Sequence, residues 1–355
     1  MSEVKVNKVS PRSGTTLTIG DSGDTTNIVG TLQNNGSELV GDISSVVAGT
    51  GLSGGGTSGA VTLNVEAAQS GVTSLGTLTA LTVNGNVSID GGTVKLDGNY
   101  PTGTNNVALG NTALDSLTSG NENTAIGAVA LTANTSGCYN VAVGDNALAA
   151  NTTGNDNTTI GMRSLLNNTT GINNTGVGRN ALRENTTAAK NTAVGSSSLA
   201  CNTTGTRNTA VGFCSLTTNT TGDDNTAFGT ESLRANTTGA NNVAVGKNAL
   251  VANTTGDENT AVGCNTLGAN TTADNNTAIG AFALDTNTEG HSNVAVGRSA
   301  LTANTTADNN TAVGFSALSS NTTGADNAAF GRRALNSNTT AAQNVAIGTC
   351  ALYTT

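Results

Sequence analysis

The side chains able to do chemistry are few in this chain of 355 residues, and they are spread along it. The one histidine, His291, lies in a column of variable residue type, so a catalytic triad or a zinc site has no second histidine to build on. We therefore expect no enzymatic activity, no catalytic or metal-binding residue and no cofactor.

The five cysteines follow neither a Cys-x-x-Cys spacing nor a fixed place in the pattern of the chain. We interpret them as small filling residues or free thiols rather than as disulfides or metal ligands. They are Cys138, Cys201, Cys214, Cys264 and Cys350.

Charged and aromatic residues recur at two variable edges of the pattern, where they could contact glycans or collect divalent cations. A solvated rim that keeps the molecule soluble explains them as well, and we assign no receptor-binding residue. These residues are Arg179, Lys247, Arg298, Arg332, Arg333, Phe213, Phe282 and Phe315 on one edge, and Asp223, Asp224, Asp257, Glu258, Asp274, Asp308 and Asp326 on the other.

The composition excludes several classes of protein. Aromatic residues make up 2% of the chain and Trp is absent, so any core must be thin and the body elongated. A net charge of -9, with 14 scattered basic residues, gives no footprint for nucleic acid or for an anionic membrane. No stretch reaches transmembrane length and the first residues lack an apolar signal region, so we expect synthesis in a cytoplasm without membrane insertion.

A 17-residue unit fills most of the chain. Glycines recur at this interval from Gly110 to Gly348, fifteen times, with the consensus N-(T/V)-A-(V/I)-G-x-x-(A/S)-L-x-x-N-T-T-G-x-x. The unit is too short and too rich in Gly and Asn-Thr clusters for a helical repeat. Short β-branched runs between turn residues predict an all-β, elongated β-solenoid or β-roll, one strand spacing per coil.

We expect three short sides in each coil, with corners at Gly144, Gly161 and their equivalents, and at Gly154. Two apolar columns are predicted to point inward: the Leu column, with Leu148 and Leu165, and the residue before each corner glycine. The latter column contains Val143, Ile160, Val177, Val194, Val211 and Phe228.

The alanine column alternates with the residue before the glycine, so we place it on the outer face, where small uncharged residues favour close packing against another copy of the chain. This column contains Ala125, Ala142, Ala193, Ala210 and Ala244. It predicts a homo-oligomeric fibre.

Two asparagine columns should stack identical amides along the rod, as in cross-β ladders. The first contains Asn140, Asn157 and Asn174, and the second contains Asn151 and Asn168. We interpret both columns as structural, although the N-T-T strings formally match a glycosylation acceptor.

Residues 1–100 differ in style from the repeats. We predict short hairpins at 3–30, a Gly-rich turn between short strands at 46–64, and a hairpin around the Asn-Gly of 78–98. The expected organisation is a docking segment at 1–45, a Gly-rich β shaft or linker at 46–100, and the solenoid at 101–355.

Two stretches resemble known families. The strings VNKVSPRSGTTLTIGDSG and SSVVAGTGLSGGGTSGAVTLN look like the N-terminal region of tail-fibre proteins of tailed phages, particularly marine ones. The strings NVAVG, NTAIG and NTAVG, followed by an Ala-Leu step, are similar to the head repeats of trimeric autotransporter adhesins, which form β-rolls about a threefold axis. Adhesin head repeats are usually about 14 residues long, and this unit has extra residues in its NTTG arm.

The resemblance implies a homotrimeric tail-fibre shaft on a virion. Its N-terminal region would bind phage tail or baseplate proteins, and the fibre would be directed at a host surface receptor such as a glycan. Neither the coiled-coil stalk nor the membrane anchor of the adhesins is found in the sequence, which favours a part of a virion over a cell-surface adhesin.

Two other solenoid classes fit less well. A hexapeptide-repeat acyltransferase needs three aliphatic corners in about 18 residues and a catalytic histidine. An ice-binding face needs two outward Thr files side by side, whereas the adjacent Thr152 and Thr153 should point to opposite faces of a strand.

Overall fold

In a computed structural model, the chain forms two units, Met1–Gly92 and Thr93–Thr355, which are described separately. The structure describes residues 103–353 and, before them, five short strands between residues 33 and 65. Residues 103–353 contain no helix, and their strands join in one 15-stranded sheet.

The strands of the first unit are antiparallel. β1 (Gln33–Asn34) pairs with β2 (Ser37–Glu38). β3 (Val46–Val47), β4 (Leu52–Gly56) and β5 (Leu63–Val65) form a second sheet in this order. The sequence predicts a Gly-rich turn between short strands here, but the glycines of Leu52–Gly56 belong to the central strand. The hairpins predicted at 3–30 and 78–98 lie outside the described residues.

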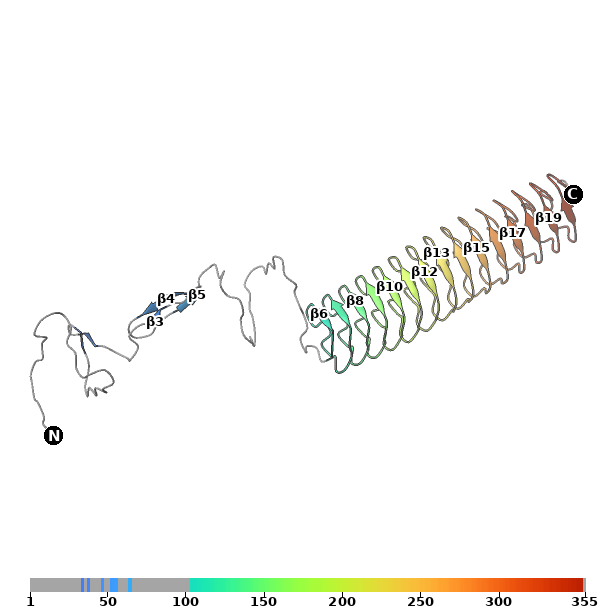
Figure 1. The fold of residues 1–355 in the computed structure, drawn as a ribbon. Helices are drawn as coiled ribbons and strands as arrows, with labels where there is room; N and C mark the ends of the chain where they lie inside the picture. Colours follow the sequence, from blue (N-terminus) through green and yellow to red (C-terminus); the bar gives the residue numbers. More distant parts are fainter. Residues whose placement is uncertain are drawn as a thin grey trace, which may run out of the picture. The chain divides into compact units, whose positions relative to one another are not determined.

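The second unit is a parallel β-solenoid with one three-residue strand in every 17 residues (Figure 1). Each strand pairs in register with its equivalents in the coils before and after, so identical columns of the repeat stack in files. Fifteen strands at about 4.8 Å give a stack of roughly 70 Å. The predicted all-β solenoid of 17-residue repeats is confirmed.

The strands of the solenoid are β6 (Val107–Leu109), β7 (Thr124–Ile126), β8 (Val141–Val143), β9 (Thr158–Ile160), β10 (Thr175–Val177), β11 (Thr192–Val194), β12 (Thr209–Val211), β13 (Thr226–Phe228), β14 (Val243–Val245), β15 (Thr260–Val262), β16 (Thr277–Ile279), β17 (Val294–Val296), β18 (Thr311–Val313), β19 (Ala328–Phe330) and β20 (Val345–Ile347).

Backbone hydrogen bonds join consecutive coils on the other sides as well. The Leu148 amide donates to the Ser164 carbonyl at 3.0 Å, and the Thr152 amide donates to the Thr169 carbonyl at 2.8 Å. Both bonds recur in the following coils. The rod is therefore held by ladders all around the coil, although only one side is a regular sheet.

The corner glycines differ from one another in conformation. Gly144 has φ of 137°, and a Cβ there would lie 2.7 Å from the Gly161 carbonyl, so this corner requires glycine. Gly154, the other predicted corner, does not have a positive φ; on that side of the coil the left-handed residue is Asp156, with φ of 57°. The column of Gly154 accordingly accepts alanine at Ala188.

The leucine of each coil is also left-handed, with φ of 52° at Leu148. This conformation costs about 1–2 kcal/mol for a residue with a Cβ. Full burial of the leucine side chain contributes about 1.5–3 kcal/mol. Burial therefore offsets the strain, and the turn directs every leucine into the coil.

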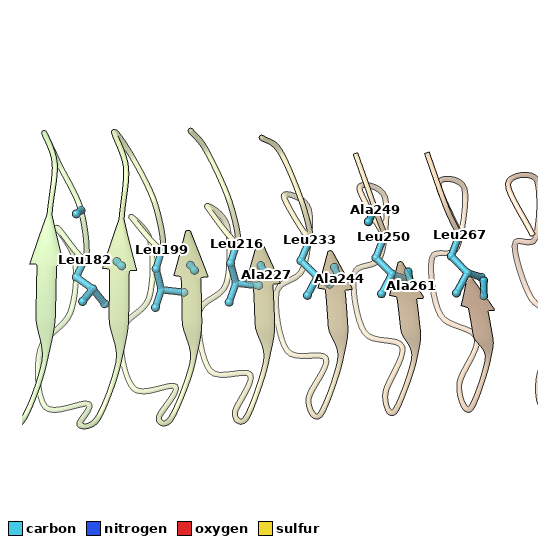
Figure 2. Packing of buried hydrophobic residues seen from close by; sticks show 14 of the residues in the cluster. Leu182, Leu199, Leu216, Ala227, Leu233, Ala244, Ala249, Leu250, Ala261 and Leu267 are labelled. Carbon is cyan, nitrogen blue, oxygen red and sulfur yellow. The ribbon is translucent and has the colours of Figure 1, made fainter. Parts of the chain in front are cut away.

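The core is a file of leucines facing a file of alanines from the strands (Figure 2). Leu148 and Leu165 are fully buried, and so are Ala142 and Ala193. The prediction for the strand faces was wrong, because the alanine column points inward and the column before the glycine points outward. Ile160 is 46% exposed and Phe228 is 55% exposed.

The narrow interior explains the inversion. The leucine fills most of the space behind the sheet, so the opposite position is alanine in most coils, and the larger Thr159 lies beside Gly176 of the next coil. Where Gly176 takes this position, a Cβ would lie 2.5 Å from the Ser164 hydroxyl. Alternation shows that alanine and the flanking residues face opposite ways, but it does not show which of them is inside.

The inversion predicts opposite effects for two neighbouring residues of β13. Ala227→Val should lower the free energy of unfolding by about 1–3 kcal/mol, because both of its neighbours in the file are alanines and the added methyl groups enter a filled core. Thr226→Val should be nearly neutral, because Val141 and Val243 already occupy the equivalent outer position. Chemical denaturation of both variants measures the difference, and equal effects would contradict the assigned faces.

Candidate interaction surfaces of the solenoid

The first asparagine file lies inside the coil. The Asn157 side-chain amide donates to Asn140 Oδ1 at 3.1 Å and to the Gly171 carbonyl at 2.9 Å, while the Asn157 backbone amide also donates to Asn140 Oδ1. Asn174 repeats the contact on Asn157. All three residues are fully buried.

The second asparagine file supports the NTTG arm. Asn168 donates to Asn151 Oδ1 at 2.8 Å and to the Gly171 carbonyl at 3.1 Å, so this carbonyl receives one amide from each file. Asn151 and Asn168 are fully buried, which makes the N-T-T acceptors inaccessible in the folded coil. The amides hold the arm against the core, and two buried atoms of these files, Asn310 Nδ2 and Asn338 Oδ1, lack a hydrogen-bond partner.

The outer surface of the 15-stranded sheet is uncharged. We call it the sheet face, and it consists of the first and third residues of each strand from β6 to β20. The first residue is Thr, Val or Ala, and the third is Val, Ile, Leu or Phe. None of these residues is buried, in contrast to the middle residue of nearly every strand.

The threonines of the NTTG arm divide into two files. The Thr152 hydroxyl donates to the Thr169 carbonyl at 3.1 Å, and the same bond recurs along this file. Thr153 and Thr170 belong to the second file and are exposed. The Thr152 file is half-buried, so the more exposed file is a single row of threonines.

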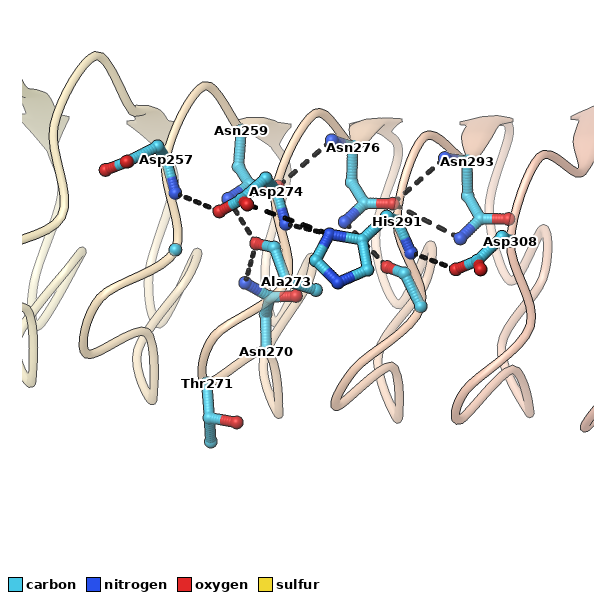
Figure 3. A network of polar contacts seen from close by, with 12 residues as sticks. Asp257, Asn259, Asn270, Thr271, Ala273, Asp274, Asn276, His291, Asn293 and Asp308 are labelled. Atoms are coloured by element: carbon cyan, nitrogen blue, oxygen red, sulfur yellow. Dashed lines mark hydrogen bonds and ion pairs between the residues drawn. The ribbon is translucent and has the colours of Figure 1, made fainter.

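A polar file runs along the corner after the arm (Figure 3). The Asp257 amide donates to Asp274 Oδ1 at 2.7 Å, the Asp274 amide to His291 Nδ1 at 2.9 Å, and the His291 amide to Asp308 Oδ1 at 2.7 Å. Each side chain thus caps a backbone amide of the preceding coil. Asp257, Asp274 and Asp308 were expected to belong to a solvated rim, and their capping role was not predicted, although the recurrence of Asp and Asn in one column could have indicated it.

Charged pairs on the surface are sparse. Arg207 and Asp224, in consecutive coils, form a bidentate pair with a shortest distance of 2.6 Å. Their hydrogen bond lowers the pKa of Asp224 and raises that of Arg207.

Burial raises the pKa of the Asp285 carboxyl. The folded chain therefore keeps this proton at a pH where the unfolded chain has lost it. The contribution of Asp285 to the free energy of unfolding falls as the pH rises through its folded-state pKa.

The cysteines and the potential metal ligands are dispersed among the described residues. Across residues 103–353 the five cysteines are free thiols, and no three metal-ligating side chains gather in one place. Nor does that part of the chain hold a helix long and apolar enough to span a membrane.

The asparagine files predict a large effect for a buried amide. Asn225→Leu removes the acceptor for the Asn242 amide and a donor to the Gly239 carbonyl, so we expect a loss of about 3 kcal/mol in the free energy of unfolding. Faster hydrogen exchange at the Asn242 amide should accompany this loss. Thr238→Ala, on the exposed file of the arm, is the control and should change stability by less than about 0.5 kcal/mol. A comparable loss in both variants would contradict the structural role of the ladder.

Comparison with known proteins identifies no relative of this chain. No protein-family model, no curated protein and no solved structure matches the chain.

Proposed function

We propose that the protein is a structural fibre protein of a phage virion, the homotrimeric shaft of a tail fibre that takes part in host attachment. The observation that carries this proposal is the uncharged, largely apolar sheet face, which continues through all fifteen strands. Monomeric soluble proteins rarely expose a continuous apolar surface of more than a few hundred Å². The proposed role is structural and includes no catalytic activity.

The size of the sheet face supports its burial against other copies. A stack of roughly 70 Å, with strands of about 10 Å, has a footprint of about 700 Å². A standard interface removes about 800 Å² from each partner. Three parallel copies with their sheet faces turned toward a common axis would bury this surface and form a closed ring.

The resemblance of the N-terminal strings to phage tail fibres supports the placement on a virion. In this proposal, residues 1–45 bind tail or baseplate proteins, and the solenoid carries the host-directed part, with a surface glycan as receptor. Immunogold labelling of virions and of infected cells separates this location from that of a cell-surface adhesin.

The oligomeric state is the central prediction. The native mass should be three times the 34.8 kDa of one chain. Val211→Lys with Val245→Lys places charges on the sheet face, and trimer formation should weaken by more than about 10-fold because the charges would be buried without partners. Native mass spectrometry and analytical ultracentrifugation measure both effects, with Thr238→Lys on the exposed arm as the matched control. A monomeric wild-type protein, or an unaffected sheet-face variant, would refute the proposed assembly.

Ice binding is the second candidate, because the strands place two outer files side by side. Thr occupies the first position in strands such as β11, β12 and β15. The third position holds bulky residues, including Phe228 and Phe330, which interrupt a regular face. We rank this function below the fibre for that reason.

A thermal-hysteresis assay tests the ranking. We expect no freezing-point hysteresis from the purified protein, because its Thr file has no second Thr file at the third strand position. A hysteresis that disappears on Thr209→Lys would favour ice binding instead.

A further inference from the structure

Two phenylalanines interrupt an otherwise uniform file of the sheet face. Phe228 ends β13 and Phe330 ends β19, six coils later, and they are 55% and 41% exposed. Their neighbours in the file are aliphatic: Val211 and Val245 beside Phe228, and Val313 and Ile347 beside Phe330. Each phenylalanine therefore projects from a row of smaller side chains.

A second phenylalanine accompanies each of them. Phe213 and Phe315 follow the corner glycines of the preceding coils and are 55% and 40% exposed. Phe213 follows Val211 by two residues, and Val211 pairs with Phe228. In the same way, Phe315 follows Val313 by two residues, and Val313 pairs with Phe330. The same two-coil arrangement thus occurs twice, six coils apart.

Identical coils create a problem for the assembly proposed above. If parallel copies pack through their sheet faces, a shift by one coil moves each file by only about 4.8 Å and brings nearly equivalent residues into contact. A uniform repetitive interface therefore has several similar alignments, because register is weakly specified where the contacts do not change.

We propose that Phe228 and Phe330, the register residues, set the axial alignment of copies packed through the sheet face. In register, phenylalanines meet at two levels, where aromatic rings pack favourably edge to face or offset. A shift by one to five coils places each ring against a smaller aliphatic residue and leaves voids at the levels it has left. A shift by six coils pairs Phe228 with Phe330 but leaves six of the fifteen strands without a partner.

Disulfide trapping tests this alignment, which rests on the proposed homo-oligomer. The five natural cysteines are first replaced by serine. In one experiment all copies carry Thr260→Cys. In the other, copies with Thr260→Cys are co-expressed with copies that carry Thr226→Cys. These positions are equivalent and two coils apart, about 10 Å along the rod, which exceeds the Cα separation of a disulfide. The wild-type face should trap the 260–260 pair and little of the 260–226 pair.

Loss of the register residues should change the trapped pairs. In the double variant Phe228→Val with Phe330→Val, the 260–226 product should rise by about 5-fold or more, since the alignments become nearly equivalent. Adding Val194→Phe to this variant should restore the 260–260 pair alone. Ile160→Val with Ile279→Val, in the same file and similarly exposed, is the matched control and should keep one alignment.

The outcomes separate this inference from the proposed function. A trimeric double variant that still traps only the 260–260 pair overturns the role of the phenylalanines but leaves the fibre intact. A trimer that traps neither pair shows that copies do not meet through the sheet face, and it also overturns the role of the phenylalanines. A monomeric wild-type protein removes the proposed assembly itself. A double variant that keeps one alignment but loses binding to host cells would assign the phenylalanines to receptor contact instead.

Discussion

The width of the coil interior is the constraint on which the rest of the structure depends. Most coils enclose one leucine opposite one alanine from the strand, and this space leaves little room for a second large side chain. Apart from Thr159, which lies beside Gly176 of the next coil, the β-branched and aromatic residues of the strands therefore lie outside. A narrow core thus produces both an elongated rod and an apolar outer surface, although the hydrophobic effect alone would bury those larger residues.

A core this thin cannot rely on apolar burial alone. Two asparagines per coil complete the interior, and their amides bond to the next asparagine of the same file and to backbone carbonyls. Buried amides are costly unless they are hydrogen-bonded, so the interior tolerates them only because the repeat places an identical partner in the adjacent coil. Strict recurrence of Asn140 and Asn151 is therefore a requirement for stability.

Much of the architecture could be predicted from the sequence, because recurrence every 17 residues restricts the chain to stacked coils. The sequence did not allow us to predict which face of each strand points inward. Alternation in a strand of three residues separates two faces but does not say which is buried, and the larger side chains wrongly favoured the residue before the glycine. The residues before the glycines, such as Ile160 and Phe228, lie on the outer face instead. The recurring Asp and Asn of one column could have indicated the capping role of Asp274 and His291, but the amide that each side chain caps depends on the path of the backbone at a corner, which residue type alone does not determine.

Every described coil between the first and the last bonds to its two neighbours through the same ladders, so the rod has no unique middle. Unequal recombination between the repeats of a gene could add or remove whole coils, and each product would close its core and its hydrogen bonds as before. The reach of such a molecule can therefore change in steps of about 4.8 Å without a new fold having to arise. Length becomes a heritable variable that is nearly independent of stability.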